Sequence, residues 1–372
     1  MIDRVLIVGG GVGGMSAAVS LSRQGVAVEL IDSDPEWRAY GAGISVTGLS
    51  LRAFEHLGVL EKVRERGFVG GGIRLRTPDG AVVMESPPLP DDAPAVERGG
   101  GIMRPALHAI MQEAVHEAGV TVTLGVEPTD FGEQDDAIRV TLSDGSERVV
   151  DLVVAADGIF SKTRAALFPE VAAPKFTGQG CWRIVADRPA HVTTTEMYIG
   201  GPVKLGINPI SADKVYAFIL EHVPDNPWFA EEEMLPHVAK LLEPFGGDIA
   251  AIRDTLGEES LVNYRPLEWQ LLPLPWHKGR VVVIGDAAHA TTPHMASGAG
   301  LAAEDGIVLA QELARTDDLA AALTAFGERR FERARLVVEN SVRIGEIEMS
   351  GGNQVDANKM LGGTMQKLKE PF

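Results

Sequence analysis

The sequence predicts an α/β fold in which a parallel sheet is joined by a second, mainly antiparallel sheet and a long C-terminal helical region. Three short apolar runs, at residues 4–8, 151–156 and 280–284, are each followed by glycine or aspartate and predict strands of the parallel sheet. Alternating runs between residues 175 and 276 predict the antiparallel sheet. Helical spacing of apolar residues over 300–348 predicts the helical region.

The first predicted strand leads directly into a glycine-rich turn. Gly9, Gly11 and Gly14 fit the pattern G-x-G-x-x-G, and an apolar helical pattern follows. The first glycine permits a tight turn, the second lets the backbone approach a pyrophosphate, and the third lets helix and strand pack closely. Free N–H groups at the helix start, around Val12 and Gly13, would then hold the anion.

A glycine pattern alone is also typical of ordinary turns, so the next strand decides between the two interpretations. Residues 26–31 form an apolar strand pattern that ends at Asp32. A carboxylate at that point can accept hydrogen bonds from both hydroxyls of a ribose. The two features together predict a dinucleotide-binding βαβ unit.

Composition restricts the partners. The formal charge of −18 argues against nucleic acid and against an anionic membrane surface. The single cysteine, Cys181, excludes an internal disulfide and a cysteine-rich metal site. No stretch reaches the roughly 20 apolar residues that span a bilayer, and no cleavage-site pattern follows the N-terminus. We therefore expect a cytoplasmic protein of one large or two coupled domains, without a metal.

Other segments have recognisable local patterns. The remaining expected helices are residues 13–23, 44–58, 60–66, 104–115 and 231–245. The remaining expected strands are a hairpin over 70–84 and the runs 121–124, 137–142 and 147–150, with a long loop at 87–101. We expect the tail after residue 351 to be a packed or frayed terminus.

Three motifs occur in a fixed order along the chain. They are Gly9-x-Gly11-x-x-Gly14, Asp157-Gly158-x-x-Ser161-x-x-Arg164 and Gly285-Asp286-Ala287-Ala288-His289. From residue 1 to about 335 the sequence resembles the para-hydroxybenzoate hydroxylase family, the single-component FAD-dependent aromatic monooxygenases. The resemblance implies a Rossmann-like FAD-binding domain (1–70, 102–174 and 277–335), an inserted, mainly antiparallel substrate domain (71–101 and 175–276), and a C-terminal helix and tail (336–372).

The resemblance also implies roles for individual residues. In the family, the glycine motif and the acid after the second strand hold the ADP part of FAD, and Gly285 and Asp286 contact the ribityl and pyrophosphate region. Further matches to FAD or to the path of the nicotinamide cofactor are Arg38, Gly43, Arg104, Asp157, Gly158 and Arg164. Three of these assignments have structural alternatives: Asp286 as a helix N-cap, Asp157 as a turn residue, and Arg164 as a purely structural contact. We expect His289 to be structural.

The segment 292–301, here called the flavin loop, places small residues at the start of a long helix. In the family this backbone lies against the edge of the flavin, where a helix start stabilises the negative charge of the reduced ring. The resemblance therefore implies that Pro293, Gly298, Ala299, Gly300 and Leu301 lie beside the flavin. The chain departs from the family at Ala296-Ser297, where Gly-Gln is common.

The implied reaction is reduction of FAD by NADH or NADPH, followed by transfer of an OH group from a flavin C4a-hydroperoxide to an aromatic ring. An apolar pocket is required, with candidates Phe176, Trp182, Tyr198, Tyr216, Phe218, Trp228 and Phe229, of which alternation in a sheet turns about half away. Polar candidates for holding or deprotonating the ring are Arg183, Lys204 and His222. Lys204 stands roughly where related branches have an arginine, and Tyr216 matches an aromatic position.

Two other classes of protein remain open at this point. One is an FAD-dependent dehydrogenase, reductase or halogenase, although the Trp-x-Trp-x-x-Pro element of flavin halogenases is absent from the sequence. The other is a flavin-binding protein without catalytic activity. The expected partners are a small aromatic substrate and O₂, in a monomer or homodimer.

Overall fold

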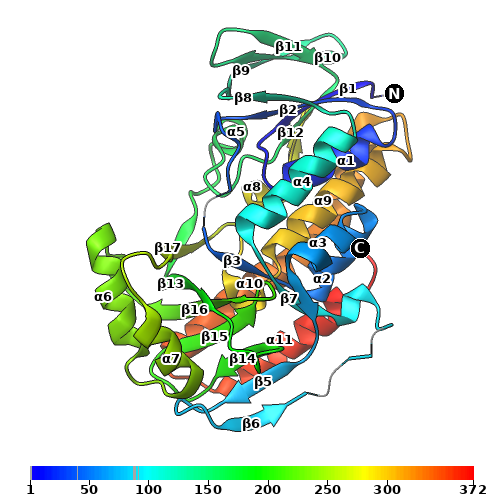
Figure 1. The fold of residues 1–372 in the computed structure, drawn as a ribbon. Helices are drawn as coiled ribbons and strands as arrows, with labels where there is room; N and C mark the ends of the chain where they lie inside the picture. The colour runs from blue at the N-terminus through cyan, green and yellow to red at the C-terminus, as the bar shows by residue number, and fades with distance from the viewer. Residues whose placement is uncertain (1, 40, 87–88, 91) are drawn as a thin grey trace.

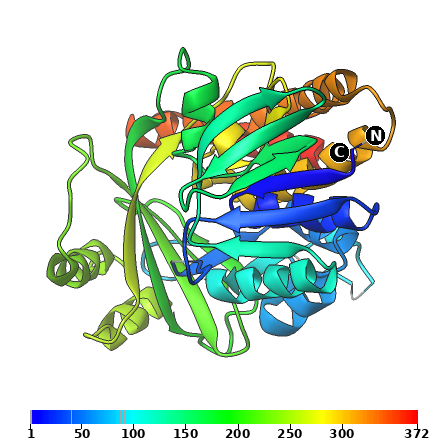
Figure 2. The ribbon, with the colours of Figure 1, turned by 90° about the horizontal axis from the view of Figure 1, so that it is seen from above.

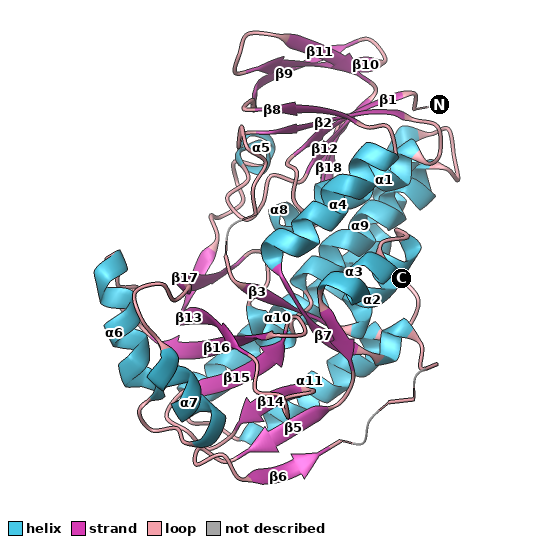
Figure 3. Ribbon diagram, in the orientation of Figure 1, coloured by secondary structure: helices cyan, strands magenta, loops and turns pink. Residues whose placement is uncertain are grey.

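The computed structural model describes residues 2–39, 41–86, 89–90 and 92–372. A six-stranded sheet lies in one half of the molecule and has the spatial order β18-β19-β12-β1-β2-β8 (Figures 1 and 3). Its strands are parallel except for β18, which pairs antiparallel with β19. Their bounds are β1 (Arg4–Val8), β2 (Ala27–Asp32), β8 (Thr121–Leu124), β12 (Leu152–Ala155), β18 (His277–Lys278) and β19 (Val281–Val283).

Two helices pack tightly on each other beside this sheet: α1 (Val12–Ser22) and α9 (Gly298–Leu313) (Figure 1). A Cβ at Gly306 would lie 2.3 Å from the backbone nitrogen of Ala17, so only glycine permits this approach. The contact brings the starts of both helices to the same side of the sheet, since Gly13 near the start of α1 faces Ala302 of α9. The other helices around this half are α2 (Gly48–His56), α3 (Leu60–Arg66), α4 (Arg104–Glu117), α5 (Lys162–Leu167) and α8 (Asp286–His289).

A seven-stranded sheet occupies the other half, with the order β17-β13-β16-β15-β14-β5-β6. It is antiparallel apart from the parallel pair of β14 and β5. Its strands are β5 (Ile73–Arg76), β6 (Val82–Glu85), β13 (Lys175–Asp187), β14 (Thr195–Tyr198), β15 (Lys204–Pro209), β16 (Lys214–His222) and β17 (Val262–Trp269). Two three-stranded sheets complete the fold: β9 (Pro128–Gln134), β10 (Ala137–Leu142) and β11 (Glu147–Val150), and β3 (Gly43–Val46), β4 (Phe68–Gly70) and β7 (Gly99–Met103).

The two faces of the seven-stranded sheet have different neighbours. Its outer face packs on α6 (Glu231–Leu242) and α7 (Gly247–Thr255), which lie at one side of the molecule (Figure 2). Its inner face, which carries Cys181, Phe218 and Tyr216, turns toward β3 and β7 and hence toward the six-stranded half. A ligand held between the two halves would therefore meet the inner face.

The C-terminal region consists of separate helices rather than one. After α9, the chain turns and Asp318 caps α10 (Leu319–Met349) by accepting a hydrogen bond from the Ala321 N–H. The tail forms α11 (Gln354–Leu368), which packs against Met295 and Leu301 through Leu368 and its neighbours. The tail is therefore packed, one of the two outcomes expected from the sequence.

Several local expectations are corrected. Residues 43–46 form a strand, not the start of a helix, because this segment pairs with β7 before α2 begins. Residues 99–101 of the expected loop belong to β7 (Gly99–Met103), and the loop's residues 87, 88 and 91 lie outside the described chain. Strand β9 and helix α7 were not expected. Two short 3₁₀ helices, η1 (Ala95–Glu97) and η2 (Pro293–Met295), also occur.

Candidate functional site: a dinucleotide cradle facing a polar sheet

Each glycine of the first motif has a separate steric reason. Gly9 has φ +103°, and a Cβ there would lie 2.4 Å from the Ala156 carbonyl oxygen. A Cβ on Gly14 would lie 1.9 Å from the Gly9 carbonyl oxygen, so this glycine permits the close packing of α1 on β1. A Cβ on Gly11, in contrast, would meet nothing within 4 Å. Gly11 therefore borders open space, as a residue under a pyrophosphate must.

That open space is a cavity of about 380 Å³ lined by Gly9, Gly11, Asp32, Asp157 and Gly158 among others, and we call it the dinucleotide cradle. Helix α1 begins at its edge, and no side chain caps the helix, so the N–H groups of its first turn are available to an anion. The Gly10 N–H donates to Asp32 Oδ2 at 2.7 Å, which fixes the carboxylate at the end of β2 and leaves lone pairs for ribose hydroxyls.

Asp157 lines the same cavity but also has a structural role. Its two oxygens accept from the Ser161 hydroxyl at 2.5 Å and from the Thr163 N–H at 3.0 Å, at the start of α5. The Arg164 guanidinium is buried and donates to the carbonyls of Ile159 and Ala287. These contacts support the structural alternatives for both residues, and their assignment to cofactor binding stays a prediction.

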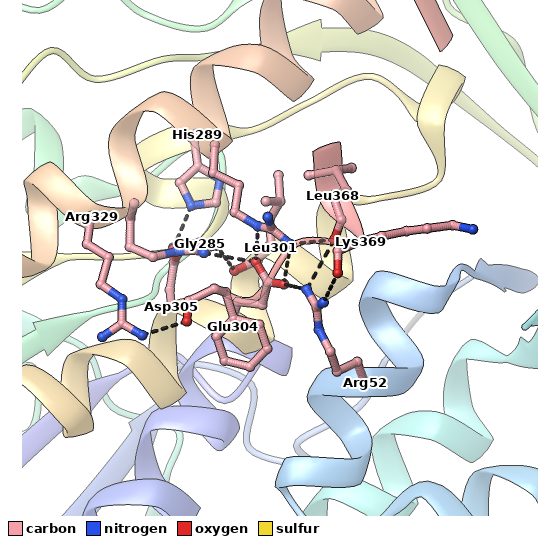
Figure 4. Close-up of polar contacts among 12 residues, drawn as sticks. Arg52, Gly285, His289, Leu301, Glu304, Asp305, Arg329, Leu368 and Lys369 are labelled. Atoms are coloured by element: carbon pink, nitrogen blue, oxygen red, sulfur yellow. Dashed lines mark hydrogen bonds and ion pairs between the residues drawn. The ribbon is translucent and has the colours of Figure 1, made fainter. Parts of the chain in front are cut away.

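The Gly285-Asp286 turn is held from behind by Asp305 of α9 (Figure 4). Gly285 has φ +59°, and its N–H donates to Asp305 Oδ2 at 2.8 Å. His289 Nε2 lies 2.5 Å from the same oxygen, and Arg330 Nε donates to Oδ1 at 2.7 Å. His289 is thus structural, as expected. Asp286 itself is exposed at the first position of α8, where its carboxylate is accessible to a ligand.

Glu304 extends this network to the C-terminal tail. Its fully buried carboxylate pairs with Arg52, Arg330 and Arg333 at 2.8–3.1 Å. Arg52 and Arg333 also donate to the carbonyl of Leu368 at the end of α11 (Figure 4). Acids near a helix start are favourable in themselves, so the position of Glu304 and Asp305 in the sequence does not reveal this role. Two adjacent acids in an otherwise apolar stretch were the signal that they must be buried with partners.

The flavin loop has unusual backbone geometry. Ala296 has φ +48° and ψ +32°, a left-handed conformation that costs a residue with a Cβ roughly 1–2 kcal/mol. It stands where the family commonly has glycine. Ser297 precedes α9 without a side-chain cap, so the N–H groups of Gly298, Ala299 and Gly300 remain available. This arrangement suits a negatively charged ring edge.

The two glycines of this segment differ in their surroundings. A Cβ on Gly300 would lie 2.7–2.9 Å from Ser50 and Leu49, so its small size lets α9 pack on α2. A Cβ on Gly298 would contact only the Thr291 methyl group, at 3.3 Å. Whether these residues, Pro293 and Leu301 also contact the flavin stays a prediction.

Two arginines lie close together between the halves. Burial, and then the charge of Arg183, lower the pKa of Arg104. Within the described chain no carboxylate lies at ion-pair distance from Arg104 or Arg183, and the buried Arg183 Nε has no hydrogen-bond partner. Two uncompensated cations favour an anion such as a phosphate. Burial raises the pKa of the neighbouring Tyr216 to about 12, so its phenol is protonated at neutral pH.

Three further residues were predicted to contact the cofactor or the substrate. Gly43 lies against the inner face, because its Cβ would be 2.6 Å from the Tyr216 Cβ. Arg38 is half-exposed and pairs with Glu36 and Asp34. Lys204 projects from the inner face, and its Nζ donates to Glu348 of α10 at 2.6 Å rather than extending into solvent.

The aromatic candidates lie on different faces of the seven-stranded sheet, because successive side chains of a strand point to opposite faces. Trp182, Tyr198 and Phe229 pack on the outer face with α6 and α7, and Trp228 is exposed. Tyr216 and Phe218 lie on the inner face. Of these six side chains, only Tyr216 and Phe218 are therefore placed to border a ligand between the halves.

The residues present fit FAD, because the open cradle at Gly11, the Asp32 carboxylate and the unpaired Arg104 match ribose and pyrophosphate, and the uncapped α9 matches a flavin edge. The fold and site define a flavin-dinucleotide protein. A family model described as an FAD binding domain matches residues 3–341, and the chain belongs to this family. It is an FAD-dependent monooxygenase of the aromatic hydroxylase type.

Individual relatives agree with this assignment. The chain is 32% identical over 352 residues to the 2-heptyl-3-hydroxy-4(1H)-quinolone synthase of Pseudomonas aeruginosa, covering 92% of this chain and 89% of the relative. It is 30% identical to the 3-hydroxybenzoate 6-hydroxylase 1 of Aquipseudomonas alcaligenes, covering 98% and 94%. The fold is similar to Klebsiella pneumoniae HpxO complexed with FAD and uric acid, with TM-score 0.84, 23% identity and coverage of 99% and 93%.

The described residues contain neither a membrane-spanning helix nor a metal-binding group of side chains. None of the helices there is both long and apolar enough to cross a membrane. No group of three or more His, Cys, Asp or Glu side chains there could hold a metal ion.

Proposed function

We propose that this monooxygenase hydroxylates a small aromatic or N-heteroaromatic compound, with NADH or NADPH as reductant and O₂ as the oxygen source. The observation that carries the proposal is the position of Tyr216 and Phe218 on the inner face, opposite the half that holds the dinucleotide cradle. Relatives named for a quinolone and for a hydroxybenzoate support an aromatic substrate.

Bound FAD would supply the redox chemistry: it accepts a hydride and activates O₂. The chain's own contribution is position and exclusion of water. Phe218 and Leu220 supply apolar surface to one side of the ring. Tyr216, as a protonated phenol, donates or accepts a hydrogen bond and is unsuited to act as a base at neutral pH. Arg183 is available to hold an anionic group of FAD, reductant or substrate.

The nicotinamide cofactor would bind only transiently, since the sequence has one complete glycine motif. Arg38 and Arg104 remain the candidate arginines for its phosphates, because the Arg164 guanidinium already donates to two carbonyls. We further propose a monomer or homodimer in the cytoplasm, where NADH and NADPH are supplied.

The test is substrate-stimulated oxidation of NADH or NADPH by the FAD-loaded enzyme. A panel of phenols, aromatic acids and N-heteroaromatics is screened at fixed O₂, and product formed under ¹⁸O₂ is analysed by mass spectrometry. We expect slow oxidation alone, faster oxidation with the correct aromatic, and one labelled oxygen in the product. Product without label would assign the enzyme to a dehydrogenase or reductase reaction instead.

A further inference from the structure

Three side chains from distant segments form a largely buried polar cluster next to the flavin loop. Glu348 near the end of α10 accepts from Lys204 Nζ of β15 through Oε1 at 2.6 Å. Its other oxygen, Oε2, lies 3.4 Å from Nε2 of His294 in η2. His294 Nδ1 lies 2.8 Å from the Thr292 hydroxyl. We call this the His294–Glu348–Lys204 cluster.

The charges in the cluster are defined by its surroundings. The His294 side chain is fully buried, and burial lowers its pKa, so the ring is neutral at neutral pH. Burial opposes ionisation of Glu348, but the nearby His294 ring, 3.4 Å away, and the Lys204 charge outweigh it and hold the pKa of Glu348 below its ordinary value. The cluster therefore carries one negative and one positive charge, and its net charge is zero.

Packing fixes the cluster in place. A Cβ at Gly345, one turn before Glu348, would lie 2.7 Å from Gln179 Oε1 and 3.1 Å from His294 Nε2. A larger residue at position 345 would have to displace the side chains of Gln179 or His294, so this glycine helps α10 approach β13 and the flavin loop closely. Gln179 Oε1, His294 Nε2 and Glu348 Oε2 are buried and have no hydrogen-bond partner of good geometry among the described residues. Two of these three atoms are acceptors, so the group favours a ligand with a donor.

The cluster also lies on the ligand side of the sheet. Lys204 pairs across the sheet with Leu220, and Gly206, two residues further along β15, lies under the ring of Phe218. Arg183 is on the same face, but it interacts with Arg104 and Tyr216 at the dinucleotide end. Lys204 is thus the cation that would meet a substrate ring next to the flavin loop.

We propose that Glu348 is a specificity-determining residue that neutralises Lys204 and selects substrates carrying an N–H or O–H donor and no carboxylate. The inference rests on the proposed function, because it assumes that an aromatic ring binds against the inner face. An unpaired lysine there would attract an aromatic carboxylate, whereas the paired one offers little net attraction. The Glu348 carboxylate in addition repels an anion.

The test measures binding and needs no turnover. The FAD-loaded enzyme is titrated with 4-hydroxyquinoline as the neutral probe and 3-hydroxybenzoate as the anionic probe, and binding is followed by the change in flavin absorbance. We expect the wild type to prefer the neutral probe at least tenfold. Glu348→Gln, which keeps the shape and removes the charge, should reduce this preference at least tenfold. The matched control is Glu346→Gln on the exposed side of the same helix, which should leave the ratio unchanged.

A second variant separates charge from general damage. In the double variant Glu348→Gln with Lys204→Gln the pair is neutral again, and the preference should return toward the wild-type ratio. An unchanged ratio in a folded Glu348→Gln enzyme, or a double variant that does not restore the preference, would overturn the proposal. If neither probe perturbs the flavin of any form, the assumed ring position is wrong and the inference falls with it. A shifted ratio without oxygen insertion would leave the specificity role and reject the proposed reaction.

Discussion

Gly11 and Gly14 are both glycines of one motif, yet the structure distinguishes their functions. Gly14 has no room for a Cβ, whereas a Cβ at Gly11 would point into open space. The backbone at Gly11, with φ −78° and ψ −177°, is extended and accessible to any residue. A side chain at Gly11 is therefore compatible with the fold and incompatible with a pyrophosphate.

Gly11→Val should consequently fold and lose FAD. We expect the melting temperature of the apoprotein to stay close to that of the wild type, and FAD affinity to fall at least about 100-fold, equivalent to about 2.8 kcal/mol. Fluorescence titration with FAD and a thermal melt of the apoprotein measure the two quantities. Gly257→Val is the control, since a Cβ there also meets nothing within 4 Å and Gly257 is not among the residues that line the cavity. A Gly11→Val protein that retains FAD would refute the cradle.

Asp305 contributes differently, because its carboxylate accepts a hydrogen bond from the Gly285 N–H and so supports the Gly285-Asp286 turn. The charges of His289 and Arg330 overcome the opposing effect of burial and lower its pKa to about 2. A depressed pKa means that this carboxylate stabilises the fold above its ordinary pKa near 3.8, and that the stabilisation is lost as the pH falls toward 2.

We therefore predict that Asp305→Asn loses about 3–5 kcal/mol of unfolding free energy at pH 7, because it leaves Arg330 with a buried, partly uncompensated charge. The difference from wild type should shrink as the pH is lowered from 4 to 2. Urea unfolding at each pH provides the measurement, and Asp136→Asn, at a fully exposed carboxylate, is the control. A constant difference across this pH range would show that the Asp305 charge is not the cause.

At the scale of elements, two glycines of the flavin loop, Gly298 and Gly300, differ in how closely their surroundings are packed. Gly298→Val meets only a movable Thr291 methyl group, whereas Gly300→Val collides with the Ser50 backbone of α2. We expect Gly298→Val to change the unfolding free energy by less than about 1 kcal/mol, and Gly300→Val to lose about 1–3 kcal/mol through overpacking.

If Gly298 also lies against the flavin, its valine variant should tilt the ring and divert more of the consumed NADH or NADPH to hydrogen peroxide. Peroxide yield, product yield and melting temperature are measured on the same preparations. A Gly298→Val enzyme that remains fully coupled would restrict Gly298 to starting a helix.

The elements that sequence patterns predicted correctly are those specified by neighbouring residues. The β1–turn–α1 unit, the 73–85 hairpin and α4 depend on local periodicity, turn residues and helix starts. The strand at residues 43–46 and β7 were missed because their stability comes from pairing with each other across more than 50 residues. Local spacing carries no information about such a partner.

The same limit applied to the site. The dinucleotide cradle was predictable because its glycines and Asp32 lie within one βαβ unit. Lys204 was predictable only as a candidate, since its partner Glu348 lies 144 residues away on a helix that looks like ordinary amphipathic structure. Asp305 and Arg330 likewise meet only after α9 and α10 have packed.

For the whole molecule, the candidate binding site is assembled from two halves that share no strand. The cradle belongs to the six-stranded sheet, whereas Tyr216 and Lys204 belong to the seven-stranded one. The protein as a whole is strongly acidic, yet Arg104 and Arg183 lie together without a carboxylate partner in the described chain. An anionic cofactor between the halves would relieve this repulsion, so binding should stabilise the folded molecule.

The last prediction concerns this stabilisation of the folded protein by cofactor binding. A ligand that binds only the folded state at 100 times its Kd adds about 2.7 kcal/mol to the unfolding free energy. With about 2.1 cal/mol/K of unfolding entropy per residue, this corresponds to roughly 3–4 °C for a chain of 372 residues. FAD should produce this shift in the apoprotein. FMN at the same concentration should produce less, because it lacks the adenosine that the Asp32 side of the cavity would hold. Gly11→Val should abolish the FAD shift, and an equal shift with FMN would contradict the assignment of the cavity to the ADP moiety.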